Sequence, residues 1–94
     1  DCAFVIGARD GDLIARLSAA IDGPLNVLAG PGTPPIAQLK SLGVRRVTFG
    51  SNFAKAAYTS VRLAATELQD NGTYEFAVDV YSQPEMHRII KGAQ

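Results

Sequence analysis

Short apolar runs alternate with longer amphipathic stretches along most of the chain. The apolar runs Ala3–Ile6, Leu25–Ala29 and Val44–Phe49 each end at a glycine, and such runs are typical of strands that are covered on both faces. After each run, apolar residues recur with the 3.6-residue period of a helix. The pattern predicts three successive βα units, and therefore a parallel sheet with right-handed crossovers.

The first two helices have recognisable ends. Asp10 is expected to cap a helix whose apolar positions begin at Leu13 and which stops at Gly23-Pro24.

Thr33, followed by two prolines, is expected to cap a helix over about residues 35–42. We predict that this second helix buries Ile36 and Leu39 and ends at Gly43.

The longest predicted helix starts after Ser51 or Asn52, either of which can cap it, and runs to Asn71-Gly72. Its apolar positions form one stripe, made of Phe53, Ala56, Ala57, Val61, Ala64 and Leu68. In the tail, Thr73 is expected to cap a short helix over residues 74–80. Ser82 and Pro84 mark the start of another that reaches about Lys91.

Three segments carry a resemblance to a known superfamily. They are GPLNVLAGPGTPPIAQLKSLGVRRVTFGS, DCAFVIGARDGDLIARL and AAYTSVRLAATELQDNGTYEF, which together span most of residues 1–77. Their amino-acid sequences resemble those of the last part of the barrel in the isocitrate lyase and phosphoenolpyruvate mutase superfamily, particularly in its small bacterial members. The resemblance implies an α/β fold made of the sixth, seventh and eighth units of a (β/α)8 TIM barrel. We expect one partial domain, with the barrel units over about residues 1–72 and a helical tail over 73–94.

The composition of the chain argues against several classes of function. Nine Lys and Arg balance nine Asp and Glu, so no basic surface is expected to bind nucleic acid. No apolar run is long enough to span a bilayer, and the first residues lack a charged region followed by an apolar one, so we expect a cytoplasmic protein. A single cysteine excludes an internal disulfide and a multi-thiolate metal site. Because the chain begins with Asp1 at the edge of a strand, we expect that it was cut from a longer protein.

Candidate binding residues follow the predicted strands. In a barrel the carboxyl ends of the strands surround the active site, which places residues 7–10, 28–33 and 48–52 at its mouth. The predicted substrate-binding residues there are Arg9, Gly30, Gly32, Gly50 and Ser51. The glycines admit backbone N–H groups close to a carboxylate or phosphate, or else they only permit tight turns. Arg9 either contacts this ligand or is a solvated arginine beside the Asp10 cap.

Polar residues also lie within the predicted strands. Asn26 is surrounded by apolar neighbours, so its amide needs hydrogen-bond partners, either in the sheet or in a substrate. Arg45 and Arg46 lie early in their strand, far from the mouth, where a stabilising or surface role is expected. An isolated three-stranded sheet would expose one face, which we expect to include Val27 and Val47.

The resemblance also implies chemistry. In the superfamily, Mg²⁺ is held by acidic residues of early strands, and lyase members carry a loop cysteine in the setting Lys-Lys-Cys-Gly-His. Neither feature occurs here, so no catalytic residue and no metal ligand is assigned to this chain. Ile6 stands where the lyases carry a glutamate after a proline, and Leu28 where they carry an asparagine on the next strand. These differences disfavour isocitrate or methylisocitrate cleavage.

We therefore expect the C-terminal fragment of a Mg²⁺-dependent lyase or mutase, acting on a small carboxylate or phosphonate and inactive alone. The alternative is a stand-alone α/β module that binds a small anion or a protein partner. Unpaired sheet edges, the stripe of the longest helix, and the helix exchange seen in the superfamily all favour a homo-oligomer.

Overall fold

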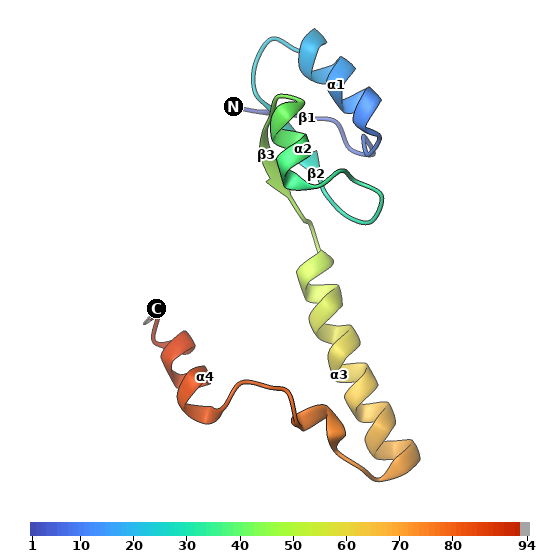
Figure 1. Cartoon of the computed structure of the whole chain (residues 1–94), viewed down its shortest axis with the longest axis vertical. Helices are drawn as coiled ribbons and strands as arrows, with labels where there is room; N and C mark the ends of the chain where they lie inside the picture. The colour runs from blue at the N-terminus through green and yellow to red at the C-terminus, as the bar shows by residue number, and fades with distance from the viewer. Residues whose placement is uncertain (93–94) are drawn as a thin grey trace. The chain divides into compact units, whose positions relative to one another are not determined.

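The computed structural model describes residues 1–92, in which strands and helices alternate (Figure 1). The elements, in chain order, are β1 (Ala3–Phe4), α1 (Gly11–Ala20), β2 (Leu25–Leu28), α2 (Ile36–Ser41), β3 (Val44–Thr48), α3 (Asn52–Asn71), the 3-10 helix η1 (Glu75–Ala77) and α4 (Gln83–Ile90). The chain divides into two compact units, Asp1–Lys55 and Ala56–Gln94.

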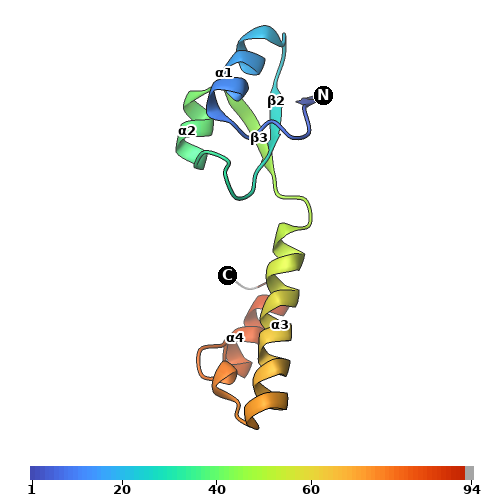
Figure 2. The same ribbon diagram turned by 90° about the vertical axis from the view of Figure 1, so that its right-hand side faces the viewer.

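The first unit contains a three-stranded parallel sheet in the order β1-β2-β3. Helices α1 and α2 lie on the same face of this sheet, as the two side views make plain (Figures 1 and 2). The predicted order of elements and the parallel pairing are confirmed. The helix-covered face holds the core of the unit.

Strand β1 is shorter than predicted. Only Ala3 and Phe4 pair with β2, where the prediction extended the strand to Ile6. Beyond Phe4 the backbone turns, because the Ala8 N–H bonds to the Val5 carbonyl and Gly7 has a φ of 92°. A residue with a side chain is strained at such a φ, so glycine allows the turn here.

The core lies between the sheet and the two helices. Its buried side chains are Ala8, Ile14, Leu25, Val27, Leu39 and Val44. Ile14 is fully buried, and burial of a side chain of this size stabilises the fold by about 1.5–3 kcal/mol. The prediction for Leu39 is confirmed, but Ile36 is 56% exposed and the prediction that it is buried was wrong. Ile36 is the first residue of α2, and Leu39 is the residue of this helix that is buried.

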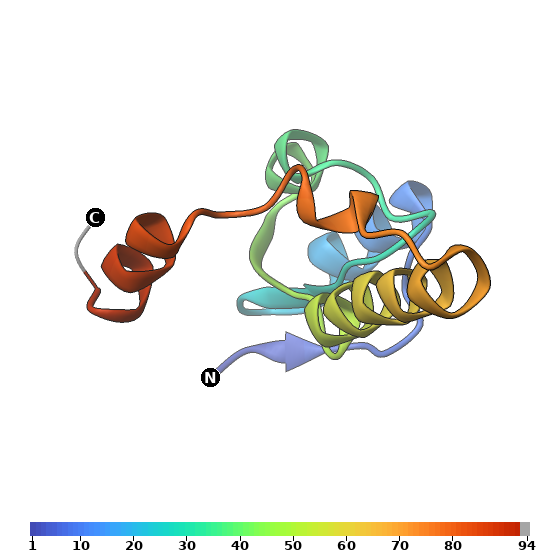
Figure 3. The same cartoon turned by 90° about the horizontal axis from the view of Figure 1, so that it is seen from below.

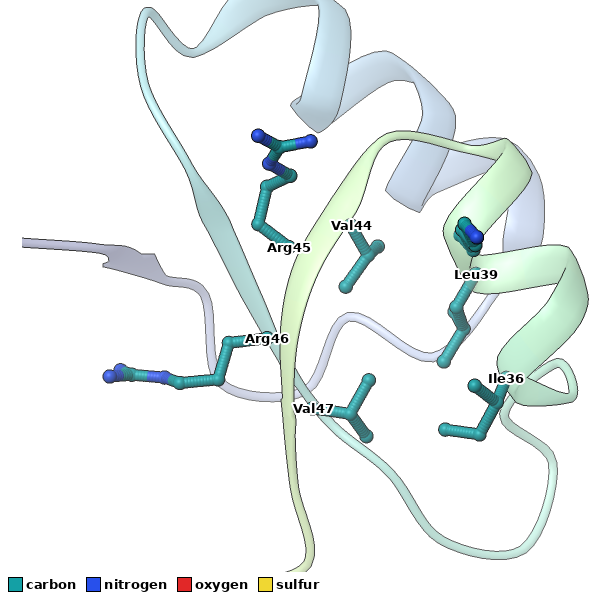
Figure 4. Close-up of a pocket in the computed structure, with 7 residues that line it drawn as sticks. Ile36, Leu39, Val44, Arg45, Arg46 and Val47 are labelled. Atoms are coloured by element: carbon teal, nitrogen blue, oxygen red, sulfur yellow. The ribbon is translucent and has the colours of Figure 1, made fainter.

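A β-bulge in β3 decides which side chains reach this core. Leu25 pairs with Val44, but the next residue, Asn26, pairs with Arg46, so Arg45 is an extra residue in β3. The inserted residue changes the alternation of the strand. Val44 and Val47 therefore both point toward α2 (Figure 4).

The prediction that Val27 and Val47 lie on the exposed face of the sheet was wrong. Val27 is buried in the core and Val47 packs against that core, so neither residue lies on the uncovered face. Both side chains face the helices. Since successive side chains of a strand point to opposite faces, their neighbours in β2 and β3 lie on the other face of the sheet. That opposite face, here called the inner face, carries Phe4, Asn26, Leu28, Arg46 and Thr48.

The N-terminal cap of α1 is the predicted residue, whereas that of α2 is not. Asp10 is the N-cap of α1, and its Oδ1 accepts the N–H of Asp12 at 3.0 Å. Thr33 does not cap α2, whose N-cap is Pro35. Its hydroxyl oxygen accepts the N–H of Gly30 at 3.1 Å instead, which closes the loop before the helix.

Helix α3 begins and ends close to the predicted residues. None of its side chains is buried, and Phe53, Val61 and Leu68 of the predicted stripe are 73%, 66% and 48% exposed. No helix among residues 1–92 is both long enough and apolar enough to cross a membrane.

In the second unit the chain turns back after α3 (Figure 1) and continues through η1 to α4 (Figure 3). The predicted helix over residues 74–80 is reduced to the 3-10 turn Glu75–Ala77. Thr73 does not cap it, because the Glu67 carboxylate does so: it accepts the Thr73 hydroxyl at 2.8 Å and the N–H groups of Glu75 and Phe76 at 2.6 and 3.1 Å.

Helix α4 begins where predicted, after Ser82. The N–H and hydroxyl of Ser82 both donate to the Glu85 carboxylate, at 2.8 and 2.6 Å. The two hydrogen bonds fix the start of the helix in a capping arrangement.

The Glu67 carboxylate makes the turn sensitive to pH. Its hydrogen bond from Thr73, helped by those from Glu75 and Phe76, holds the pKa of Glu67 below its ordinary value. The hydrogen bonds favour the charged carboxylate, so their stabilisation is complete above the ordinary pKa of glutamate. It is lost as the pH falls through the lowered pKa of the folded state.

We expect Glu67→Gln to weaken this turn at neutral pH. The pH dependence of the Glu75 and Phe76 amide shifts in NMR titrations should also disappear in this variant. Glu75→Gln is the matched control, since it keeps the backbone donor and the Glu67 carboxylate. Amide shifts that titrate equally in Glu67→Gln and in the wild type would contradict this account.

Candidate functional site

A pocket lies at the carboxyl ends of β2 and β3, within the first unit. Its volume is about 240 Å³. The lining residues are Arg9, Leu28, Ala29, Gly30, Pro31, Phe49, Gly50, Ser51, Asn52 and Lys55. The pocket therefore occupies the edge of the sheet where ligands bind in parallel α/β folds.

The loop after β2 forms one wall and is held by its own hydrogen bonds. The Gly30 N–H donates to the Thr33 hydroxyl, and the Thr33 N–H donates to the Gly30 carbonyl at 3.0 Å. These two bonds close a tight turn over Pro31 and Gly32. The wall is consequently made largely of backbone.

Asn52 joins this loop to the start of α3. Its Nδ2 donates to the Ala29 carbonyl at 3.0 Å, and its N–H bonds to the Phe49 carbonyl. A Cβ built on Gly30 would lie 3.2 Å from that Nδ2, which is tighter than most real contacts. Gly30 thus allows the loop and the Asn52 amide to approach closely.

The opposite wall follows β3. Phe49 packs edge-on against Phe53, with ring centroids 5.3 Å apart and an interplanar angle of 74°. Gly50 has a φ of 55°, and a Cβ there would lie 3.3 Å from Leu28 Cδ1. The turn after β3 therefore requires glycine for both its backbone conformation and its close contact.

The charge of the pocket is positive. Arg9 and Lys55 contribute the only ionisable side chains of the lining, and no carboxylate lies among these residues. Arginine forms paired hydrogen bonds with carboxylates and phosphates, and lysine attracts them as a point charge. The arrangement suits a small anion.

The predicted binding residues fall into two groups. Arg9, Gly30, Gly50 and Ser51 all line the pocket. Gly32 and Asn26 do not. Gly32 lies in the adjacent turn with a φ of 89°, and a Cβ built on it would meet nothing within 4 Å.

Asn26 lies within the sheet, 1% exposed. Its amide accepts from Arg46 Nε at 3.1 Å and donates to the Thr48 hydroxyl at 3.2 Å. The hydrogen-bond partners that this buried amide needs are therefore supplied by β3.

Two lining residues with polar side chains, Asn52 and Lys55, were not among the predicted binding residues. Asn52 was considered only as a possible helix cap, although it lies within the range expected at the mouth. Lys55 lies outside that range, in the first turn of α3. A cation one helical turn after Ser51 was the available signal, because it returns to the same side of the helix.

A second pocket of about 340 Å³ lies between α2 and β3 on the helix-covered face (Figure 4). Ile36, Leu39, Val44 and Val47 form its apolar floor, and Lys40, Arg45 and Arg46 complete the lining. Figure 4 shows the Arg45 and Arg46 side chains pointing away from this apolar floor. We assign it no chemical role.

Metal ligands are lacking from the part of the chain that the structure describes. No group of three or more His, Cys, Asp or Glu side chains is gathered there in a way that would hold a metal ion. Residues 1–92 do not by themselves fit a magnesium site, which requires carboxylate oxygens.

Comparison with known proteins places the fold in a family. Residues 1–69 match the family model described as phosphoenolpyruvate phosphomutase. A protein from Burkholderia cenocepacia J2315, assigned as a lyase/mutase, has a crystal structure similar to 96% of the chain, with 33% identity and a TM-score of 0.90. No curated protein is detectably similar.

A second solved structure shows the same fold. It is oxaloacetate acetylhydrolase in complex with its product oxalate, similar over 99% of the chain with 21% identity and a TM-score of 0.70. The chain spans 33% and 37% of the lengths of these two structures. It corresponds to the C-terminal part of a TIM-barrel lyase fold, as predicted.

Asn52→Ala tests the link between the two walls of the pocket. We expect a loss of about 1 kcal/mol of stability, because the Ala29 carbonyl loses its side-chain donor. The measurement is the free energy of unfolding by denaturant. Asn71→Ala, at the last position of the same helix, is the control, and an equal loss in both variants would contradict the proposed link.

Proposed function

The chain belongs to the phosphoenolpyruvate phosphomutase family, within the isocitrate lyase and phosphoenolpyruvate mutase superfamily, and from this premise we propose its function. It forms the C-terminal part of a Mg²⁺-dependent lyase or mutase that breaks or rearranges a C–C or P–C bond. The substrate is a small carboxylate or phosphonate. One observation carries the proposal, namely a positive pocket at the strand ends of a barrel fold from this family.

In this proposal the described residues bind the anionic end of the substrate. Arg9 and Lys55 supply positive charge from two different elements of the pocket. Gly30, Gly50 and Ser51 contribute backbone that an anion can approach closely. Gly32 acts by allowing the turn that places Gly30, and Asn26 acts within the sheet beneath the pocket.

The metal belongs to another part of the proposed enzyme. The superfamily is generally metal-dependent. Because the described residues do not fit a magnesium site, we place its ligands in barrel strands outside this chain, and this chain alone is inactive. We further propose a cytoplasmic, homo-oligomeric enzyme.

The two pocket cations provide the main test. In the full-length protein with Mg²⁺, Arg9→Met and Lys55→Met should each weaken the binding of oxalate or phosphonoacetate by about tenfold or more. Isothermal titration calorimetry measures the affinities. Arg45→Met and Lys40→Met are matched controls, because these residues line the groove between α2 and β3.

Equal effects of the pocket and control substitutions would contradict a specific role for this pocket. Binding of either probe by residues 1–94 alone, without metal, would instead favour the alternative of a stand-alone anion-binding module.

The exposed stripe of α3 tests the proposed assembly. Because Phe53 and Val61 are largely exposed, we expect this stripe to be buried between subunits, and Val61→Lys to lower the mass measured by light scattering. Thr59→Lys, roughly on the other side of the helix, is the control. A wild-type protein that is monomeric at micromolar concentration would contradict the oligomer.

A further inference from the structure

A row of polar side chains crosses the inner face of the sheet below the pocket. Arg46 Nε donates to Asn26 Oδ1 at 3.1 Å, and Asn26 Nδ2 donates to the Thr48 hydroxyl at 3.2 Å. These three residues are here called the polar row. Asn26 is 1% exposed, so both ends of its amide depend on the other two members for hydrogen bonds.

The bulge at Arg45 creates the polar row. Without an extra residue, regular alternation would place Arg46 on the same face as Val44, against α2. The bulge sends Arg46 to the other side, and Figure 4 shows its side chain pointing away from Val44 and Val47. Bulges commonly redirect a side chain beside a functional site.

The polar row connects to both walls of the pocket. The Thr48 carbonyl accepts the N–H of Ala29 at 2.8 Å, which joins the ends of β3 and β2. Ala29 lines the pocket, and Phe49, the residue after Thr48, lines it from the other strand. A displacement of Thr48 would therefore change the spacing of the two walls.

We propose that Arg46 is a positioning residue that holds the two walls of the strand-end pocket in register through Asn26 and Thr48. The proposal rests on the proposed function, since it concerns the same anion site, but it assigns a role to a residue that does not line that pocket. Arg46 does not contact the substrate in this account. Its effect is transmitted through two hydrogen bonds to the hydroxyl of Thr48.

The rate of hydrogen exchange at the Ala29 amide tests whether Arg46 holds the ends of β2 and β3 together. Methionine at position 46 cannot donate to Asn26 Oδ1, so Arg46→Met in the full-length protein should speed Ala29 exchange by about tenfold or more. The amide of Leu39, which bonds to the Pro35 carbonyl in α2, reports general destabilisation and should change little. Arg45→Met is the matched control, and Arg46→Lys, which keeps a donor, should restore much of the protection.

The affinity for oxalate, measured with Mg²⁺ present, tests whether the loss of the polar row weakens anion binding in the pocket. We expect Arg46→Met and Asn26→Leu each to weaken binding by about tenfold. The double variant should lose no more than either single one, because residues that act as one unit are not additive. Arg45→Met should bind as the wild type does.

Three results would overturn the proposal. The first is equal Ala29 exchange in Arg46→Met and Arg45→Met, and the second is equal acceleration at Ala29 and Leu39, which indicates only a general structural role. The third is faster Ala29 exchange with unchanged oxalate affinity. A wild-type protein that binds neither oxalate nor phosphonoacetate contradicts the proposed function, while the exchange experiment still decides whether Arg46 holds the walls.

Discussion

The pairing of β2 with β3, including the one extra residue at Arg45, is the constraint on which the first unit depends. It sends Val44 and Val47 to the helix-covered face, where they complete the core. It also brings Arg46 against the buried amide of Asn26. Because a shift of one residue exchanges the two faces of a strand, the apolar core and the polar row are consequences of the same backbone irregularity.

The strand-end pocket depends on backbone more than on side chains. The loop after β2 is closed by Thr33, and Asn52 fixes it to the start of α3. Gly30 and Gly50 are needed because a Cβ at either position would crowd a neighbouring side chain. This backbone frame leaves Arg9 and Lys55 as the two cations among the lining residues that can attract an anionic ligand.

Local patterns predicted the order of the elements and most of their ends. Asp10 and Ser82 mark helix starts through hydrogen bonds to neighbouring residues, so sequence alone was sufficient there. The two wrongly predicted caps, Thr33 and Thr73, have a common cause. Thr33 serves the preceding loop rather than the helix, and Glu67 supplies the cap expected from Thr73. Each of these outcomes depends on a competing hydrogen bond that spacing alone cannot rank.

The mouth of the site was predictable from the three strand ends, yet its contacts across the sheet were not. The bulge depends on pairing between two strands about twenty residues apart, as the Asn26–Arg46 separation shows, and no local pattern records it.

Acidic side chains are absent from the lining of the strand-end pocket. The pocket carries Arg9 and Lys55 with no acidic residue, whereas a Mg²⁺ ion needs carboxylate ligands. A carboxylate among the lining residues would attract Arg9 and Lys55 and weaken their hold on a substrate anion. Under the proposed function, the two kinds of group are separated between different strands of the barrel. A substrate anion bound at the mouth would contact the cations of this chain, while residues outside it would hold the metal.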